Sequence, residues 1–149
     1  MAGPATTPRA CPVAAALTVI GEKWSLLVIR ELALGVHRFD EIQRKTGAPR
    51  DILTLRLRRL EEAGVVDRRR YLERPARFEY HLTPAGDELR PVLLSLAQWG
   101  ERWTPQPSPL EFVHTCGAVT EVVHTCKECG EPVTGLDLRG RRRAVDTAA

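Results

Sequence analysis

The residues of this 149-residue chain best suited to chemistry are its four cysteines and the histidines near three of them. Cys126 and Cys129 have two residues between them, and a glycine follows Cys129. This spacing lets backbone N–H groups of a tight turn face both sulfurs. With Cys116 and either His114 or His124, they supply the four N/S ligands of a tetrahedral Zn²⁺ site. Four protein ligands leave no open position, so the expected cofactor is a structural zinc ion. The second Cys-x-x-Cys pair of a strong zinc motif is missing, and free or disulfide-bonded cysteines are the alternative.

Cys11, the fourth cysteine, directly precedes Pro12, and proline is typical of the first position of a helix. The unpaired N–H groups and the dipole at a helix start favour a thiolate there. Electrophiles and peroxides attack the thiolate form of cysteine. Cys11 is therefore a candidate redox sensor, and a buried, inert cysteine is the competing interpretation.

Composition and pattern exclude several classes of protein. Hydrophobic residues make up 43% of the chain and charged residues 28%, which is typical of a folded globular protein. The longest uncharged stretch, residues 10–21, is far shorter than the ~20 residues that span a bilayer, and no secretory signal is recognisable. We therefore expect a cytoplasmic protein with no membrane partner. The sequence contains no nucleophile elbow, P-loop, dinucleotide-binding glycine pattern or paired carboxylates, so we do not expect an enzyme.

Hydrophobic periodicity and turn residues predict four helices, a two-stranded ribbon and a long final helix. The helices cover residues 12–20, 23–34, 38–46 and 50–63, the strands residues 65–72 and 77–82, and the final helix residues 85–103. Pro91 lies inside the final helix and is expected to kink it. The predicted fold class is α+β, mainly α: a winged helix-turn-helix with a long C-terminal dimerisation helix, plus a small zinc-ribbon-like β tail.

Shifts in composition divide the chain into five segments. They are a flexible arm (1–10), a winged helix-turn-helix DNA-binding and dimerisation domain (11–103), a Pro-rich linker (104–109), a small Cys/His ribbon (110–138) and a basic flexible tail (139–149). Short strands are expected in the ribbon at residues 112–116 and 119–124.

The basic charge is concentrated in one part of the chain. Residues 36–81 hold 12 basic and 8 acidic residues, whereas the rest of the chain holds 10 and 11. In a winged helix-turn-helix, the second helix of the motif enters the major groove, and a basic ribbon beside it contacts phosphates or the minor groove. The basic residues are concentrated in the predicted helix-turn-helix and the ribbon, which are the elements that would contact DNA. The sequence therefore predicts binding to double-stranded DNA. A solvated charged face is the alternative.

The helix predicted over residues 50–63 has two different faces. Leucines at positions 53, 57 and 60 form a stripe that should be buried. The opposite face holds the residues that we expect at base edges: Arg50, Thr54, Leu55 and Arg58. Leu55 is suited to contact a thymine methyl group. Asp51 either accepts from cytosine or, in the favoured interpretation, stabilises the helix N-terminus.

A second group of arginines is expected to contact the DNA backbone or to lie on the wing. Its members are Arg38, Arg70, Arg74 and Arg77. Arg56 is a further phosphate candidate, and an ion pair with a glutamate of the same chain is its alternative role. Phosphate contacts position a protein on the duplex, whereas contacts with base edges select the sequence.

Residues 11–103 resemble the HxlR family of bacterial transcription regulators, relatives of the MarR winged-helix proteins. The resemblance rests on Cys11-Pro12, Gly21-Glu-Lys-Trp24-Ser-Leu-Leu, Arg38-Phe39, Leu53-x-x-Arg56-Leu57-x-x-Leu60-Glu-x-x-Gly64, Glu79-Tyr80-x-Leu82-Thr83-x-x-Gly86 and Trp99-Gly100. It implies a homodimer that binds an inverted-repeat operator and responds to oxidants, electrophiles or a small aromatic effector. The position of Cys11 resembles that of the redox-sensing cysteine of several family members.

These observations predict a dimeric, sequence-specific DNA-binding transcriptional regulator, acting as a repressor. Dimerisation is expected because a module of this size cannot easily cover the apolar residues of its final helix, Leu93, Leu96, Trp99 and Trp103. The alternative function is a zinc-ribbon protein- or RNA-interaction module that binds no operator.

Overall fold

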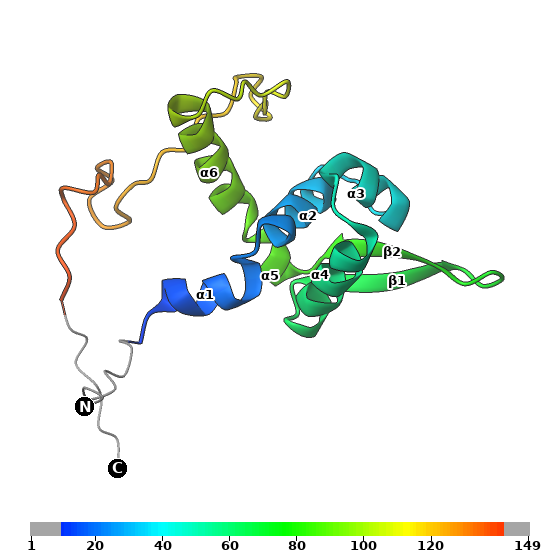
Figure 1. Cartoon of the computed structure of the whole chain (residues 1–149). Coiled ribbons are helices and arrows are strands. Elements are labelled where there is room, and N and C mark those ends of the chain that lie inside the picture. The colour runs from blue at the N-terminus through cyan, green and yellow to red at the C-terminus, as the bar shows by residue number, and fades with distance from the viewer. Residues whose placement is uncertain (1–9, 142–149) are drawn as a thin grey trace, which may run out of the picture. The chain divides into compact units, whose positions relative to one another are not determined.

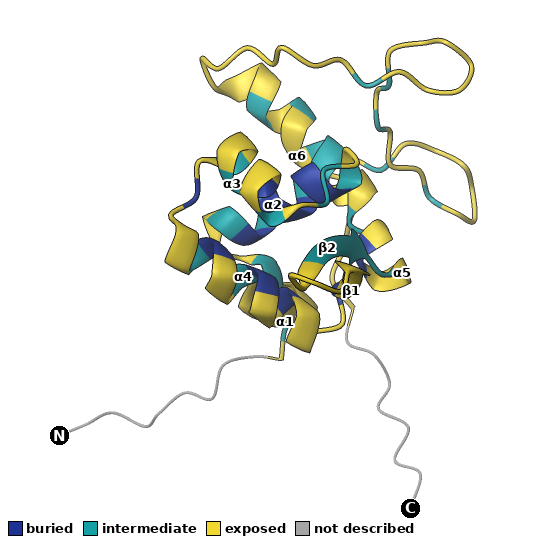
Figure 2. Ribbon diagram, turned by 90° about the vertical axis from the view of Figure 1, so that its right-hand side faces the viewer, coloured by how far each residue is buried: buried dark blue, intermediate teal, exposed yellow. Residues whose placement is uncertain are grey.

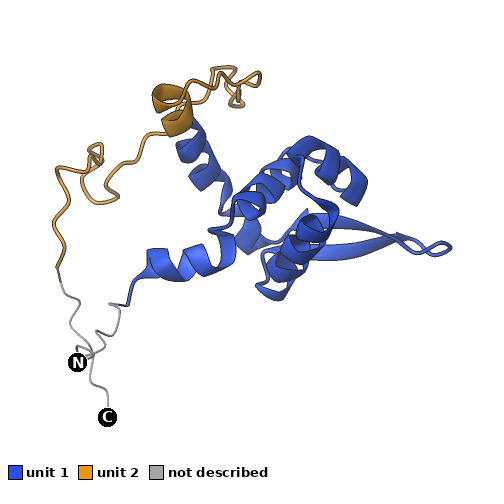
Figure 3. Cartoon of the chain, in the orientation of Figure 1, with its two compact units in different colours: residues 1–97 blue, residues 98–149 orange. Residues whose placement is uncertain are grey.

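The structure is a computed structural model that describes residues 10–141 (Figure 1). Its elements are α1 (Pro12–Ile20), α2 (Lys23–Ala33), α3 (Phe39–Thr46), α4 (Arg50–Glu62), β1 (Val66–Leu72), β2 (Arg77–Leu82), α5 (Pro84–Asp87) and α6 (Arg90–Trp103). The chain divides into two compact units, residues 1–97 and residues 98–149, and the division falls inside α6 (Figure 3). The predicted linker at 104–109 follows the end of α6.

The first four helices and both strands confirm the sequence prediction to within one residue at each end. Local signals explain this agreement. Pro12 occupies the start of α1, where its missing N–H costs no hydrogen bond. Gly47 ends α3 with φ of +73°, a left-handed conformation that favours glycine. Pro49 then precedes α4, so α3 and α4 are joined by a three-residue turn.

The hydrophobic core of the first unit lies between α2, α3, α4 and the base of the ribbon. Val28, Ile29 and Leu32 of α2 are buried, as are Ile42 of α3 and Val66 of β1. The leucine stripe of α4 is fully buried as predicted, and Figure 2 shows it as the dark side of that helix. Among residues 10–141, every buried hydrophobic residue therefore lies between positions 28 and 66.

The strands β1 and β2 form an antiparallel ribbon that extends beyond the helices (Figure 1). Its base is anchored: Val66 pairs with Leu82, and the segment before α3 adds an Arg38–Glu79 bridge. The Tyr80 N–H also donates to the His37 carbonyl oxygen at 2.9 Å. In β1 only Val66 is buried and the other residues are exposed, whereas five of the six residues of β2 are half-buried.

The predicted continuous helix over residues 85–103 is wrong, because two separate helices occupy this stretch. The short α5 ends at Asp87, and α6 begins at Arg90 after a two-residue turn. Pro91 has no N–H and cannot donate to the carbonyl of residue 87, so the break falls just before it instead of forming a kink. No residue of α6 is buried.

The strands predicted in the second unit are also wrong. Residues 112–116 and 119–124 contribute only the isolated bridge Val113–Val119, and a second bridge joins Thr125 to Pro132. No residue in the described range 98–141 is buried. A hairpin needs an apolar face to pack against before it extends into regular strands, and this unit provides none.

Among residues 10–141, no single helix is both long and apolar enough to cross a bilayer. Only α1 and α2 taken together reach the required length and composition, and a bend of 77° separates them.

Candidate nucleic-acid interface

The outward face of α4 is positioned by the burial of its opposite face. Arg50 and Arg58 expose 67% and 76% of their side chains, and Leu55 is 40% exposed, which is unusual for a leucine on a core helix. Thr54 lies between them, and its hydroxyl donates to the Arg50 carbonyl at 2.8 Å. The four residues predicted at base edges therefore share the solvent-facing side of α4.

Arg50 is held at the start of α4 by side chains of α3. Its Nη1 lies 3.1 Å from Oδ1 of Asp40, and its guanidinium carbon lies 4.8 Å from the ring centre of Phe39. No pattern in the sequence indicated either partner, because both contacts cross the turn between two helices. Asp51 lies in the first turn of α4, where a carboxylate stabilises the helix N-terminus.

Arg56 is placed differently from the other arginines of α4. Its side chain is only 11% exposed, and its Nη2 lies 3.3 Å from Oε2 of Glu22, the residue just before α2. Its Nε is buried and has no hydrogen-bond partner within residues 10–141. The intramolecular ion pair that the sequence left open is thus present, and this geometry does not favour a phosphate contact by Arg56.

Two arginines of the wing lie close to an aromatic ring. The guanidinium carbon of Arg68 lies 3.6 Å from the ring centre of Phe78, and that of Arg70 lies 5.5 Å from the same ring. Arg70 also pairs with Glu73 at 3.3 Å. Cation–π contacts of this kind attract the guanidinium groups to the ring of Phe78. Arg68 was not among the predicted contacts, although its place in the basic strand was a visible signal.

Two predicted arginines near the tip of the wing, Arg74 and Arg77, are exposed. Neither forms an ion pair with any other residue in the range 10–141. Both are therefore available to an external anion.

Arg38 connects the wing to the start of α3. Its Nε lies 3.3 Å from Oε1 of Glu79, and its guanidinium carbon lies 5.0 Å from the ring centre of Tyr71. Nearby, burial raises the pKa of Tyr80, against a smaller opposing effect of Arg68, so the Tyr80 phenol stays neutral. Arg38 keeps 58% of its side chain exposed, which leaves room for a phosphate contact.

Exposed ion pairs such as these are weak, typically about 0.2–1 kcal/mol. Arg58 forms such a pair as well, with its Nε 2.8 Å from Oε1 of Glu62. The carboxylates of Asp40, Glu62 and Glu73 therefore bind their arginines only weakly, whereas Glu79 is half-buried, with 26% of its side chain exposed. A DNA phosphate can replace such a partner at little cost, because a charge-assisted hydrogen bond to phosphate is at least as strong.

Cys11 lies at the N-cap of α1 and is partly exposed. Its carbonyl accepts the N–H of Ala15 at 3.0 Å, as an N-cap carbonyl does, and its side chain makes no capping hydrogen bond. The thiol is thus neither buried nor occupied by the helix end.

The predicted zinc ligands lie in the second unit in two separate turns. His114 and Cys116 share one turn, Cys126 and Cys129 share the next, and His124 precedes the latter. Within the described residues, no three His, Cys, Asp or Glu side chains lie close enough together to hold a metal ion. The structure therefore places the candidate ligands in two turns, two in each, and does not bring all four together.

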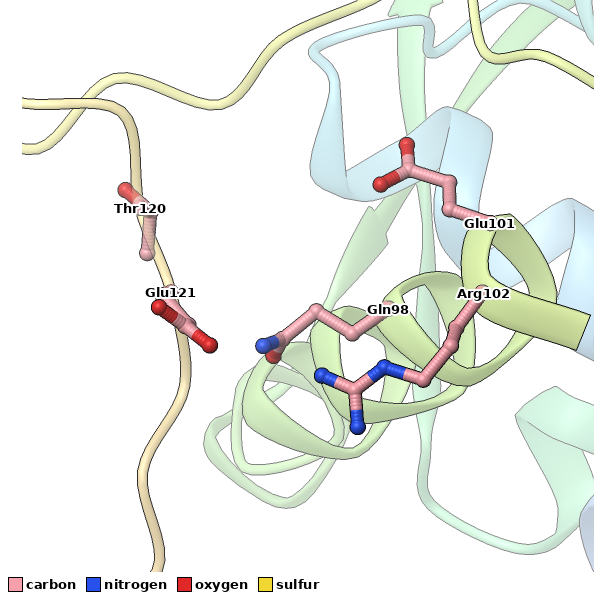
Figure 4. A pocket seen from close by; sticks show the side chains of 5 residues that line it. All are labelled: Gln98, Glu101, Arg102, Thr120 and Glu121. Atoms are coloured by element: carbon pink, nitrogen blue, oxygen red, sulfur yellow. The ribbon is translucent and has the colours of Figure 1, made fainter.

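A polar hollow in the second unit is lined by Gln98, Glu101, Arg102, Thr120 and Glu121 (Figure 4). Gln98 points from α6 toward the facing segment, and its Oε1 accepts the Val122 N–H at 2.9 Å. Apolar side chains do not line this hollow, so it does not suit a small aromatic effector.

A short helix, a three-residue turn, a second helix with a cationic outer face and a basic ribbon together define a winged helix-turn-helix. The chain belongs to the HxlR-like helix-turn-helix family, whose pattern matches residues 19–108. It is a transcriptional regulator of the helix-turn-helix type, a class that acts by binding DNA.

Several curated relatives carry the same description. The chain is 42% identical over 129 residues to the HTH-type transcriptional regulator Rv3095 of Mycobacterium tuberculosis, covering 85% of this chain and 82% of that protein. It is 38% identical over 102 residues to the HTH-type regulator YdeP of Bacillus subtilis, covering 68% and 80%. These relatives are regulators, which argues against an enzyme.

Solved structures show the same fold. The candidate transcription factor PA1607 matches with a TM-score of 0.79 and 35% identity, over 91% of this chain and 96% of that one. The oxidised form of the redox regulator HypR matches with a TM-score of 0.56 and 38% identity, over 62% and 96%. The reduced form of the transcriptional regulator YodB from B. subtilis matches with a TM-score of 0.54 and 27% identity, over 66% and 96%.

The placement of Arg56 leads to a stability prediction. Arg56→Ala should lower the free energy of unfolding by about 1–2 kcal/mol, because it removes a buried aliphatic stem and an ion pair. Arg56→Met should recover most of this loss, since it keeps the stem and removes the unpaired Nε. Arg58→Ala, on the exposed side of the same helix, should cost no more than about 0.5 kcal/mol. Urea denaturation monitored by circular dichroism measures the free energy of unfolding of all three variants. Equal losses for Arg56→Ala and Arg58→Ala would show that Arg56 is exposed.

Proposed function

We propose that the protein is a dimeric, sequence-specific repressor whose α4 reads the major groove of an inverted-repeat operator. The observation that carries this proposal is the exposed face of α4, on which Arg50, Thr54, Leu55 and Arg58 lie together while the opposite face is fully buried. Arginine donates to guanine, threonine to several bases, and leucine contacts the thymine methyl group. Repression follows because a protein bound over a promoter blocks transcription without any further interaction.

The wing arginines and Arg38 are assigned to the DNA backbone. Arg74 and Arg77 have no carboxylate to displace, so they would gain the most from a phosphate. Arg70 would exchange an exposed glutamate, Glu73, for a phosphate oxygen, and Arg38 would exchange the half-buried Glu79. Lysine- and arginine-phosphate contacts release counterions, so this part of the affinity should fall steeply with salt.

Base-reading and phosphate-binding arginines can be separated by experiment. Arg77→Ala should weaken binding to every duplex about equally and reduce the slope of log K against log salt by about 1. Arg58→Ala should cost about 1–3 kcal/mol on operator DNA and much less on unrelated duplexes. Fluorescence anisotropy with a duplex from upstream of the gene and a scrambled duplex, at several salt concentrations, measures both.

Arg139→Ala is the matched control, because it removes the same charge from an exposed position outside residues 11–103. It should leave affinity and salt slope unchanged. If Arg58→Ala and Arg77→Ala behave like this control, the assigned DNA surface is wrong. Tighter binding to RNA of the same sequence would favour the interaction-module alternative.

The dimer is proposed from apolar surface that no residue of the described chain buries. Leu96, Trp99 and Trp103 of α6 are 50–68% exposed, and Val13 and Leu17 of α1 are 55–65% exposed. Neither helix contains a buried residue. Exposed tryptophans at helical spacing are typical of an interface, and a two-fold pair would present two α4 helices to two half-sites.

This dimer can be tested by sedimentation. Trp99→Glu should shift the protein from dimer to monomer at micromolar concentration, because the charge would be buried without a partner in the interface. Leu136→Glu is the control, since Leu136 is 97% exposed and lies outside both helices. A wild-type monomer at micromolar concentration, or equal behaviour of the two variants, would argue against α6 as the dimer interface.

We further propose that a redox or electrophile signal acts through Cys11. Its place at the N-cap of α1, its partial exposure and the similarity of the chain to the redox regulator HypR support this role. Cys11 is partly exposed and its side chain makes no capping hydrogen bond, so a reagent can reach the thiol. A small aromatic effector is the alternative signal, but the polar hollow of the second unit does not support it.

Cys11 should react as an accessible thiol. With limiting iodoacetamide at neutral pH, it should be alkylated about as fast in the folded protein as in urea, because it is partly exposed, and mass spectrometry of the N-terminal peptide measures both rates. Alkylation should lower operator affinity, and Cys11→Ser should bind DNA normally and be insensitive to the reagent. Slower alkylation in the folded protein, or full loss of affinity in Cys11→Ser after treatment, would exclude Cys11 as the sensor.

A further inference from the structure

The second unit contains two short hairpins of closely similar construction. In the first, Val113 bridges Val119 and the His114 N–H donates to the Ala118 carbonyl at 2.8 Å. In the second, Thr125 bridges Pro132 and the Cys126 N–H donates to the Glu131 carbonyl at 2.8 Å. Each hairpin thus has a metal-ligating residue type at the first position inside its bridge.

Each turn also ends in the same way, with a cysteine followed by a glycine of positive φ. Gly117 follows Cys116 with φ of +89°, and Gly130 follows Cys129 with φ of +75°. No atom crowds either glycine, so the left-handed backbone itself is what requires glycine there. The two turns therefore each present two N/S side chains, His114 with Cys116 and Cys126 with Cys129.

The backbone closes both turns in a similar way. In the first turn the Gly117 N–H donates to the His114 carbonyl at 2.8 Å, and in the second the Gly130 N–H donates to the Cys126 carbonyl at 2.8 Å. The Cys116 N–H also donates to Nδ1 of His114 at 3.3 Å. Each closed turn thus holds its two candidate ligands in one short loop.

No hydrophobic core holds the two hairpins in place. None of the described residues 98–141 is buried, and Val113, Val119 and Val123 are each more than 60% exposed. A β module of this size needs a metal ion or disulfides to supply the folding energy that a core would give. The cysteines of the described chain are free thiols.

We propose that His114, Cys116, Cys126 and Cys129 bind one structural Zn²⁺ that joins the two hairpins into a zinc ribbon. Each hairpin contributes two ligands, which is why His114 and not His124 completes the set: the second turn already supplies its pair. Since no three candidate ligands lie together in the described chain, metal binding must draw the two turns toward each other. Four protein ligands leave no position for water or substrate, so the ion has no catalytic role.

Elemental analysis of the untagged full-length protein, purified under reducing conditions and dialysed against zinc and then against metal-free buffer, tests this proposal. About one zinc per chain is expected. The variants Cys116→Ser, Cys126→Ser and Cys129→Ser should lose it, whereas Cys11→Ser should retain it. The protein substituted with Co²⁺ should show the intense visible absorption of a tetrahedral thiolate site.

The pair His114→Ala and His124→Ala tests the fourth ligand. Loss of zinc from the first and retention by the second supports the proposed set, and the reverse result overturns it. Limited proteolysis with a chelator should increase cleavage between the two hairpins while the winged domain keeps its DNA affinity. The proposal is overturned if the protein holds no zinc after dialysis against zinc and then metal-free buffer. It is also overturned if Cys126 and Cys129 form a disulfide under reducing conditions.

Discussion

The burial of three leucines on α4 is the constraint on which the proposed DNA-reading surface depends. Leu53, Leu57 and Leu60 are at most 1% exposed, and burying each contributes roughly 1.5–3 kcal/mol. The exposed ion pairs of α4 contribute about 0.2–1 kcal/mol each. The leucine stripe, and not the charges, therefore fixes the rotation of the helix about its axis. That rotation decides which side chains face outward, and it leaves the arginines free to change partners.

Because this constraint is periodic, much of it could be predicted from the sequence. The spacing of the leucines correctly placed Arg50, Thr54 and Arg58 on the opposite face. The same spacing also indicated that Arg56 lies near the buried face. It is three residues after Leu53 and four before Leu60, at the edge of the leucine stripe. Its partner Glu22 belongs to the segment before α2, and no local pattern links two residues so far apart. The same limit hid the Asp40 and Phe39 contacts of Arg50.

The predictions for the region after the wing failed for a different reason. Apolar residues at helical spacing continue through Pro91, so the pattern suggested one helix, but a missing backbone N–H outweighed it. The short strands expected after residue 110 had the right residue types and no surface to pack against. Sequence patterns report what a segment prefers, whereas its extent depends on tertiary partners.

The location of the core bears on how a signal could reach the proposed DNA-binding surface. Among residues 10–141, every buried hydrophobic residue lies between positions 28 and 66, and Val19 and Ile20 of α1 and Leu93 of α6 pack against this core while only partly buried. Both helices also carry exposed apolar residues, and Cys11 lies at the start of α1. In the proposed dimer, a modification at Cys11 would leave the outward face of α4 intact and change how the two copies are held. The spacing of the two half-sites is fixed by the helical repeat of DNA. A small displacement at α1 would then prevent both α4 helices from binding at once, and the affinity gained from two linked sites would be lost.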